Sequence, residues 1–394
     1  MTHSLSELIT SLAPDAIAVR HHLHAHPELS NEEEQTSKFV AERLTALGVD
    51  TLRTGVGGHG VVAEIRGNQI QTGQTLALRA DMDALPIQEL SSLPYCSTKP
   101  GVMHACGHDG HTATLLGTAA ALTQLREEYA GTVRLIFQPA EEGVQGAARM
   151  CIEGVMDGVD RVVALHGWPG LAIGKIGTKP GAMMASSDTF DLVIRGKGAH
   201  AAQPHNSVDP IVIAAHLVTA LQTISSREVS PTEAVVVTIA QIHAGTAYNV
   251  IPTEAVLKGT VRCLTNELRE QIPVRIEAIA KNLCAAFRAD CELTYRWGTK
   301  PTVNDESVNA LIEQIGQEAL GEGSVLRLLA PSMGAEDFAA YLDYAPGCMF
   351  RLGVGEEVTN LHTPTYNFSD GAVSVGMEMF TRIALKTLTS ERAA

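Results

Sequence analysis

The sequence predicts an α/β protein in which one α/β domain is interrupted near its middle by an inserted β-α-β-β-α-β domain of the ferredoxin-like type. Three observations support this prediction. The chain has 394 residues, too many for one ordinary core at roughly 150 residues per domain. Its first part alternates helical patterns with short, nearly all-apolar strands, as in the buried sheet of an α/β protein. From about Ser187 the pattern changes to the order of a split βαβ unit.

The first part of the chain contains three segments with the helical spacing of apolar residues. They span residues 5–23, 33–47 and 112–125. Strands are predicted at residues 61–65, 75–79, 132–137 and 161–165. The last two are apolar enough for the middle of a sheet. The glycine-rich segment 170–181 is expected to connect this layer to the insertion.

The inserted domain is predicted from four strands and two helices. The strands are expected at 189–194, 234–240, 255–262 and 291–297. One helix begins just after Asp209-Pro210, because proline suits the first helical position. The other spans 268–287 and contains Pro273, so it is expected to be kinked there or to begin later. The predicted domains are therefore 1–186 with 299–394, and the insertion 187–298.

The composition excludes several classes of protein. With 29 basic and 44 acidic residues the net charge is −15, and aromatic residues make up 4%. Binding to a nucleic acid backbone needs clustered positive charge, so no nucleic acid partner is expected. No run of about 18 apolar residues and no signal-peptide pattern is seen, so no membrane association is expected. Seven scattered cysteines indicate a reducing cytoplasm rather than a disulfide framework.

The segment 101–111, GVMHACGHDGH, is the strongest candidate for a metal site. Thiolate and imidazole are preferred ligands of zinc and its neighbours. Glycines let the loop bend enough for Cys106 and His108 to face one ion. The alternative is a polar loop that leads into a helix, with His104 and His111 as ordinary hydrogen-bonding residues.

Other candidate groups follow predicted strands. Glu141 and Glu142 lie in QPAEEG, directly after the strand 132–137, where the ligands of open α/β sheets collect. Two adjacent carboxylates repel each other unless a cation or proton intervenes, so one is expected to bind metal while the other faces substrate. The alternative is a solvated acidic turn. His166 ends another strand and His362 lies in a turn-rich loop, and each alone is more often structural than a ligand.

The motifs together resemble the M20 metallopeptidase family, and specifically its amidohydrolase branch of hippurate hydrolases, N-acyl-amino-acid amidohydrolases (aminoacylases) and auxin-conjugate hydrolases. The resemblance covers nearly the whole chain. The matching motifs are HPE at 26–28, LRADMDALPI at 78–87, MHACGHDGH, FQPAEEG, LHGWP, GAHAAQPH at 198–205, NVIP at 249–252, MGAEDF at 333–338 and LHTPTYNF. It implies a metallopeptidase-type catalytic domain at 1–186 and 299–394, with a lid and dimerisation domain at 187–298.

The resemblance also implies roles for single residues. The family's metal ligands fall on Cys106, His108, Glu142, His166 and His362, and its catalytic base falls on Glu141. Other branches use a His-x-Asp pair where this chain has Asp81 and Asp83. We expect Asp83 to support the ligands from the second layer, with direct ligation as the alternative. The histidine-rich segment HHLHAHPE is expected to be a helix end and surface turn.

Three residues of the insertion are implied to contact substrate. His200 matches the lid histidine that stabilises the developing oxyanion, in many members from a partner subunit. Asn249 and Arg262 match residues that grip the substrate carboxylate, and the planar guanidinium suits that task. For Arg262 the alternative is an exposed cross-strand charge pair. His205 and His243 are expected to be structural.

The resemblance predicts metal-dependent hydrolysis of the amide bond of N-acyl amino acids by a homodimer or tetramer that carries two divalent ions. Thiolate and imidazole favour zinc, while manganese, cobalt and nickel stay open. The acyl group also stays open. A dipeptidase or an N-acetyl-diaminopimelate-type deacetylase is the nearest alternative. Two further alternatives are a thiol enzyme with Cys106 as nucleophile, and a metal- or ligand-binding protein without catalysis.

Overall fold

The computed structural model describes residues 4–69, 73–143 and 145–388. The chain folds as two compact units. The first contains Met1–Gly181, Val303–Ala330 and Asp337–Ala394, and the second contains Ala182–Thr302 and Pro331–Glu336. The sequence analysis expects the insertion at 187–298, whereas the second unit is somewhat wider and takes in the separate segment Pro331–Glu336. The chain passes between the units at four points, of which two lie in the short strands β7 (Gly181–Met184) and β14 (Thr302–Asn304) and two flank the segment Pro331–Glu336.

The first unit is built on an eight-stranded sheet with the order β1-β2-β4-β3-β5-β16-β6-β15. Its strands are β1 (Thr51–Val56), β2 (Gly60–Arg66), β3 (Thr75–Asp81), β4 (Thr132–Gln138), β5 (Arg161–Trp168), β6 (Ile176–Thr178), β15 (Val325–Arg327) and β16 (Gly347–Gly353). The central strands β4, β3, β5 and β16 are parallel to one another, so their carboxyl ends share one edge. The apolar runs predicted for β4 and β5 are buried as expected. The sequence analysis missed β1, whose residues are mostly exposed.

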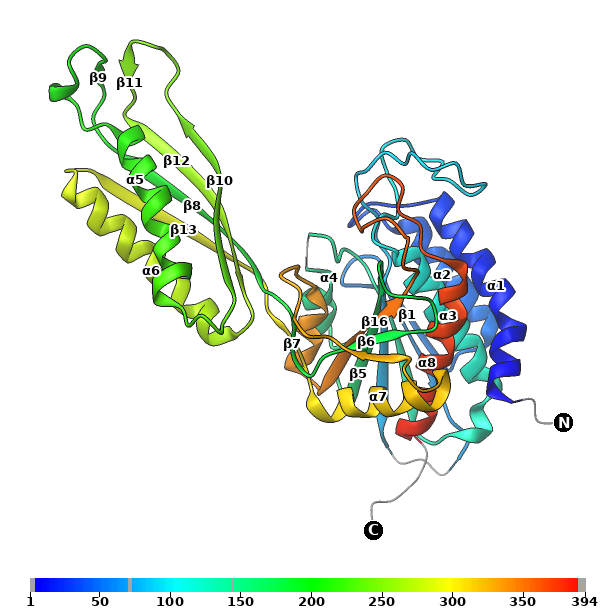
Figure 1. Cartoon of the computed structure of the whole chain (residues 1–394). Helices are drawn as coiled ribbons and strands as arrows, with labels where there is room; N and C mark the ends of the chain where they lie inside the picture. Colours follow the sequence, from blue (N-terminus) through cyan, green and yellow to red (C-terminus); the bar gives the residue numbers. More distant parts are fainter. Residues whose placement is uncertain (1–3, 70–72, 144, 389–394) are drawn as a thin grey trace. The chain divides into compact units, whose positions relative to one another are not determined.

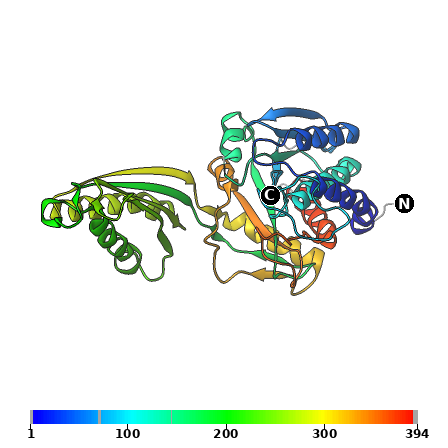
Figure 2. The ribbon, with the colours of Figure 1, turned by 90° about the horizontal axis from the view of Figure 1, so that it is seen from above.

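Helices cover this sheet. They are α1 (Leu5–Ala25), α2 (Glu34–Leu47), α3 (His108–Gln124), α4 (Gly146–Ile152), α7 (Glu306–Leu320) and α8 (Asp370–Leu388), with 3₁₀ turns η1 (Arg126–Glu128) and η4 (Asp337–Asp343). Ser4 and Glu7 form a capping box that starts α1. Helices α1, α3 and α8 pack side by side (Figures 1 and 2). Their apolar faces and the inner face of the sheet form one continuous core.

Helix α3 begins four residues earlier than the apolar pattern predicts, at His108 rather than at residue 112. Gly107 adopts a left-handed conformation, with φ of 92°, and turns the chain into the helix. A side chain at this position would also approach the hydroxyl of Tyr366 to 2.8 Å. The second half of the metal motif therefore lies on the first turn of a buried helix.

The second unit is a four-stranded antiparallel sheet with the order β10-β12-β8-β13. Its main elements are β8 (Ser187–Arg195), α5 (Pro210–Thr223), β10 (Val235–Ala244), β12 (Glu254–Cys263), α6 (Asn266–Ala286) and β13 (Asp290–Thr299). This is the predicted β-α-β-β-α-β order. Helices α5 and α6 pack together on one face of the sheet (Figure 1). Smaller elements are β9 (Ala199–His200), η2 (Pro204–Asn206), the π-helical turn η3 (Ile224–Glu228) and β11 (Val250–Ile251).

Helix α6 settles one open expectation. Its cap residue is Thr265, whose side chain accepts a hydrogen bond from the Leu268 backbone N–H, and the helix continues through Pro273. The later start considered for this helix is therefore wrong. On the buried side, Arg269 pairs with both carboxylate oxygens of Asp188 at 2.7 and 2.9 Å and ties the helix to β8. None of the described helices is both long and apolar enough to cross a bilayer.

Candidate metal centre

Cys106 and His108 lie on either side of Gly107, at the point where the motif loop turns into α3. Both side chains are buried, Cys106 with 6% and His108 with 0% of its surface exposed. The left-handed Gly107 reverses the chain locally. The ligand atoms of the two side chains therefore lie within 4.8 Å of each other. The sequence analysis expects this, because the glycines of the motif allow the loop to bend.

The rings of His108 and His166 are both oriented by backbone carbonyls. Nδ1 of His108 lies 2.8 Å from the carbonyl oxygen of Asp83, and Nδ1 of His166 lies 2.8 Å from that of Gly167. A carbonyl oxygen only accepts, so each Nδ1 carries a proton, and Nε2 is the nitrogen of each ring that faces the other candidate ligands. Nε2 of His166 lies 3.5 Å from Sγ of Cys106. Hydrogen bonds of this kind also fix the tautomer of metal-binding histidines.

The adjacent glutamates are held by a turn at the end of β4. Ala140 has a φ of 54°, unusual for a residue other than glycine, and its N–H donates to Glu33 at 2.8 Å. The N–H groups of Glu141 and Glu142 both donate to the carboxylate of Asp83, at 3.1 and 3.0 Å. Asp83 thus positions both glutamates through their backbone. Because both its oxygens accept these bonds, the arrangement matches the expected supporting role better than direct ligation.

Glu142 and His362 complete the cluster from segments that lie far apart in the sequence. Oε1 of Glu142 lies 3.3 Å from Nε2 of His362 and 4.0 Å from Nε2 of His108. His362 has a left-handed backbone, with φ of 60°, and its N–H donates to the carbonyl oxygen of Ala105 at 2.8 Å. That bond holds the turn-rich loop against the motif loop. Glu142 and His362 come from separate loops, so the packing of those loops brings the two side chains together.

The ligand atoms of the five predicted metal ligands form overlapping groups. Cys106 belongs to one group with His108 and His166, and to another with Glu142 and His362, and the ligand atoms in each lie within 4.8 Å of one another. Glu141 joins His108 and Glu142 in a third such group. In the part of the chain that the structure describes, Nε2 of His108 and Oε1 of Glu142 are buried and make no hydrogen bond. A thiol, imidazoles and a carboxylate that lie together, with buried atoms that make no hydrogen bond, fit divalent metal ions.

A neighbouring group of Asp81, His108 and His111 is also close enough to hold an ion. Both nitrogens of His111 are already used, because Nδ1 donates to Asp81 at 2.7 Å and Nε2 accepts the N–H of Gly167 at 2.8 Å. The second oxygen of Asp81 accepts from Arg79 at 2.8 Å. His111 is therefore the ordinary hydrogen-bonding residue that the sequence analysis considers. It fixes the backbone next to His166.

Burial decides the charge of the cysteine and of His166 without bound metal. Burial, together with the charge of Glu142, raises the pKa of the Cys106 thiol well above its usual range. Burial and the neighbouring His111 lower the pKa of His166 well below its usual range. Both groups are thus neutral at pH 7, and binding of an ion to the sulfur would release a proton.

The histidine-rich end of α1 differs from the expected surface turn. The helix does end at Ala25, but His24 is completely buried. Its ring lies 2.9 Å from Asp109, the residue after His108, and 3.3 Å from Glu89. The other titratable groups around the ring are Arg20, Tyr95 and His104. The surface-turn expectation is wrong for His24, because the apolar pattern of α1 does not reveal a buried carboxylate on another helix.

His24 predicts a pH-dependent contribution to stability. Burial opposes its charge, but Asp109 and Glu89 outweigh burial and raise its pKa to about 9. Protonated His24 contributes its full stabilisation of the fold at pH values below 6.5, which is about its pKa in the unfolded chain. That stabilisation is lost as the pH rises through 9, because the ring then loses its proton in the folded state as well. His24→Gln is therefore expected to lower the free energy of unfolding by about 3 kcal/mol at pH 6. The difference in the free energy of unfolding between His24→Gln and wild type should become smaller above pH 9.

Urea unfolding at pH 6 and pH 9.5 measures this effect, with His243→Gln as the matched control. His243 is exposed and contacts Gln241, so its replacement should leave the midpoint unchanged at both pH values. An equal loss of stability for His24→Gln at the two pH values would show that packing, and not charge, is the main contribution of His24.

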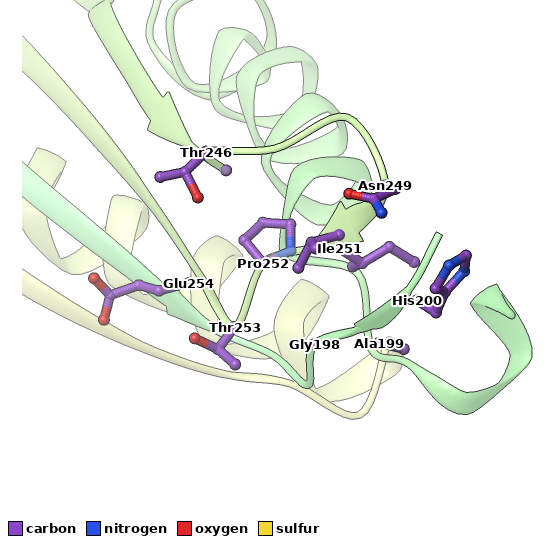
Figure 3. A pocket seen from close by; sticks show the side chains of 11 residues that line it. Gly198, Ala199, His200, Thr246, Asn249, Ile251, Pro252, Thr253 and Glu254 are labelled. Carbon is purple, nitrogen blue, oxygen red and sulfur yellow. The ribbon is translucent and has the colours of Figure 1, made fainter. Parts of the chain in front are cut away.

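In the second unit, His200 and Asn249 lie together at an open cavity of about 660 Å³ (Figure 3). His200 on β9 pairs with Val250 on β11, and the N–H of Ala201 donates to the carbonyl oxygen of Asn249 at 3.0 Å. Nδ1 of His200 accepts the N–H of Ala202 at 3.1 Å, which leaves Nε2 to donate. The structure thus brings two of the three predicted substrate-binding residues of this unit to one cavity.

Arg262 does not line that cavity. It lies near the end of β12, whereas Glu254 at the start of the same strand lines the cavity. Eight residues of strand separate the two positions by about 26 Å. The residue opposite Arg262 on β10 is Val236, so the charge pair considered as its alternative is not formed with that strand. Its guanidinium instead bonds to Thr260 and to the carbonyl oxygen of Val261.

The sequence analysis missed one polar residue near the cluster. Arg351 lies on β16 directly opposite His166 on β5, with 9% of its surface exposed. Burial lowers its pKa to about 10. The signal was present in the sequence, because Arg351 is the only charged residue in the run GCMFRLG at 347–353. A charged residue in an otherwise apolar, buried strand indicates a charged or polar partner, which the composition alone does not identify.

The chain is similar to several known proteins. Residues 77–386 match the description "Peptidase family M20/M25/M40". The chain is 41% identical to the N-acetyl-L-cysteine deacetylase of Bacillus subtilis over 93% of its length and 86% of that protein. It is 47% identical to the N-acyl-L-amino acid amidohydrolase of Geobacillus stearothermophilus over 76% of its length and 80% of that protein. The crystal structure of the Bacillus subtilis YXEP protein, described as a dinuclear metal binding peptidase from the M20 family, superposes with a TM-score of 0.86 at 36% identity, covering 96% of this chain and 99% of that one.

Proposed function

Because the chain belongs to the peptidase family M20/M25/M40, we propose that it hydrolyses the amide bond of N-acyl amino acids and releases a carboxylic acid and a free amino acid. The chain is a metal-binding hydrolase of the amidohydrolase type, as its relatives indicate. Relatives named as deacetylases or hydrolases of N-acyl amino acids support this class of substrate. The identity of the acyl group is the finer part of the proposal.

The observation that carries the proposal is the convergence of Cys106, His108, His166, Glu142 and His362 beside Glu141. We assign these five residues as the ligands that would hold two divalent ions. When bound, such ions would supply a water of lowered pKa and polarise the scissile carbonyl. A glutamate next to this cluster has the position that a general base needs.

Glu141 takes the proton of the attacking water and returns it to the leaving amine. Its neighbour Glu142 is used as a ligand, because adjacent residues point in different directions from one turn. Asp83 orients both through its two hydrogen bonds to their N–H groups. A fixed backbone keeps the base in one place while its side chain moves the proton between oxygen and nitrogen.

His200 donates a hydrogen bond to the carbonyl oxygen as negative charge develops there, a contribution of roughly 3–4 kcal/mol in comparable oxyanion sites. Asn249, at the same cavity, binds the substrate carboxylate. Arg262 is proposed for the same carboxylate by resemblance. It lies about 26 Å along β12 from Glu254, the residue of that strand that lines the cavity.

We propose that the protein acts in the cytoplasm as a homodimer through the second unit. Its seven cysteines are all unpaired, which suits a reducing compartment. Strand β10 is an edge of the four-stranded sheet, and Ile242 on it is 53% exposed. Sedimentation velocity at micromolar concentration is expected to give the mass of a dimer. A monomer under these conditions would contradict this assignment.

A release assay tests the proposed reaction. The protein is reconstituted separately with zinc, manganese, cobalt and nickel and offered hippurate, N-acetyl amino acids, indole-acetyl conjugates, N-acetyl-diaminopimelate and dipeptides. Liberation of free amino acid from the acyl compounds but not from dipeptides is expected. Faster cleavage of dipeptides would favour the peptidase alternative, and no turnover with any ion would favour a binding protein without catalysis.

A further inference from the structure

Arg351 is a buried arginine without a counter-ion among the described residues. In the part of the chain that the structure describes, three other arginines are at least nine-tenths buried. Each pairs with a carboxylate: Arg20 with Asp109, Arg79 with Asp81 and Arg269 with Asp188. Across residues 4–69, 73–143 and 145–388, Arg351 forms no ion pair or hydrogen bond, and its Nε is buried and unsatisfied. Because an unpaired buried charge costs free energy, this arrangement points to a partner that is not part of the chain.

The strand register places Arg351 beside the metal cluster. Phe350 and Leu352 belong to the core, so Arg351 between them points to the opposite side of the sheet. Neighbouring residues in register on parallel strands share a face, and Arg351 is in register with His166. Its guanidinium carbon lies 3.6 Å from the ring centre of Trp168, and that ring lies 5.8 Å from the ring of His166.

Stacking on Trp168 leaves the guanidinium ready for an anion. A guanidinium that lies on an aromatic face uses its flat surface for that contact, so its N–H donors stay available in the plane. In-plane donors match the two oxygens of a carboxylate in a bidentate pair. The tryptophan also fixes the orientation of the flexible side chain, which lowers the entropy lost when the pair forms.

We propose that Arg351 is a specificity residue that pairs with a carboxylate of the substrate. This inference rests on the proposed amidohydrolase function. An N-acyl amino acid offers this chemistry from three sources: the α-carboxylate, an acid at the far end of the acyl chain, and an acidic amino-acid side chain. All three are carboxylates, and matched neutral analogues distinguish them.

The experiment compares three pairs of compounds that differ in one carboxylate. They are N-acetyl-L-alanine and N-acetyl-L-alaninamide, N-succinyl-L-alanine and N-succinamoyl-L-alanine, and N-acetyl-L-glutamate and N-acetyl-L-glutamine. The kcat/KM of the metal-loaded wild type is compared with that of Arg351→Met, Arg351→Lys and the control Arg53→Met, whose side chain is exposed on β1. Equilibrium binding of the same compounds is measured by calorimetry.

For one pair we expect Arg351→Met to lower kcat/KM and affinity for the acid by about 10- to 100-fold, the range of a lost charge-assisted hydrogen bond. Its neutral partner should change by less than about twofold. For the acid, the kcat/KM of Arg351→Lys should lie between those of wild type and Arg351→Met. Lysine keeps the positive charge but lacks the planar, two-pronged set of N–H donors. Arg351→Met should unfold at or above the wild-type temperature, because it removes an unpaired buried charge.

Two results would overturn the inference. Equal losses for acids and neutral analogues, with a lower unfolding temperature, would show that Arg351 is structural. Unchanged kinetics and binding would show that it contacts no substrate carboxylate. If the wild type cleaves none of the amides, the proposed function fails instead, and the calorimetric comparison alone then decides whether Arg351 binds a carboxylate.

Discussion

Replacing Glu141 by glutamine is expected to lower kcat by about 10²- to 10⁴-fold, the usual contribution of a positioned general base. Glutamine has nearly the same shape but cannot take a proton from water. The backbone N–H of residue 141 still donates to Asp83, so the turn that holds Glu142 should stay intact. Metal content, measured by mass spectrometry of the purified protein, should therefore equal that of wild type.

Two matched variants sharpen this result. Glu153→Gln removes an exposed carboxylate at the end of α4 and should leave kcat unchanged. Glu142→Gln alters a proposed ligand and should reduce metal content as well as rate. Near-normal turnover of Glu141→Gln with full metal occupancy would refute the assignment of the base. Loss of metal in that variant would mean that Glu141 and not Glu142 is the ligand.

Removal of metal by a chelator is expected to lower activity on the order of 10³-fold, since Lewis-acid stabilisation of several kcal/mol is lost. Activity should return when zinc, manganese, cobalt or nickel is added back. The bare protein should also unfold at a lower temperature, because ion binding to the native state stabilises it. Differential scanning calorimetry with and without the ion measures that shift.

The same experiment separates the metal enzyme from a thiol enzyme. A cysteine nucleophile would keep working after chelation, and full activity in a preparation free of transition metal would end the metal assignment. Cys106→Ala should weaken ion binding and abolish recovery. Cys151→Ala is the matched control, because Cys151 is buried in the same unit, on α4, and belongs to none of the candidate metal groups in the described residues.

The fold class and the predicted α/β pattern were accessible from the chain because they depend on local periodicity. The two strands that carry this part of the site were predicted, since buried parallel strands leave long apolar runs. Glu141 follows β4 as expected, whereas His166 lies inside β5, which continues to Trp168 and not only to residue 165. Element ends were harder. The pattern placed the start of α3 after the motif, whereas Gly107 begins the helix at His108. A glycine's backbone conformation depends on its tertiary neighbours as well as on its sequence neighbours.

The candidate site was also predictable only in part from the sequence. Motifs indicated which donors exist and gave each a chemical role, and Asp83 was expected to support the ligands. Its bonds to the N–H groups of Glu141 and Glu142 depend on how β3 and β4 align, which spacing does not encode. The burial of His24 and the separation of Arg262 from His200 likewise required coordinates.

By itself, the order of amino acids determined the kinds of ligand, the helix and strand pattern and the class of reaction, because these follow from side-chain chemistry and short-range periodicity. Tertiary structure decided which donors meet, which backbone groups orient them and where a charge lacks a partner. Arg351 shows the reason: its neighbour His166 comes from a distant strand, and only the pairing of β16 with β5 sets them side by side. Contacts between distant segments are chosen by packing of the whole core, which no local pattern records.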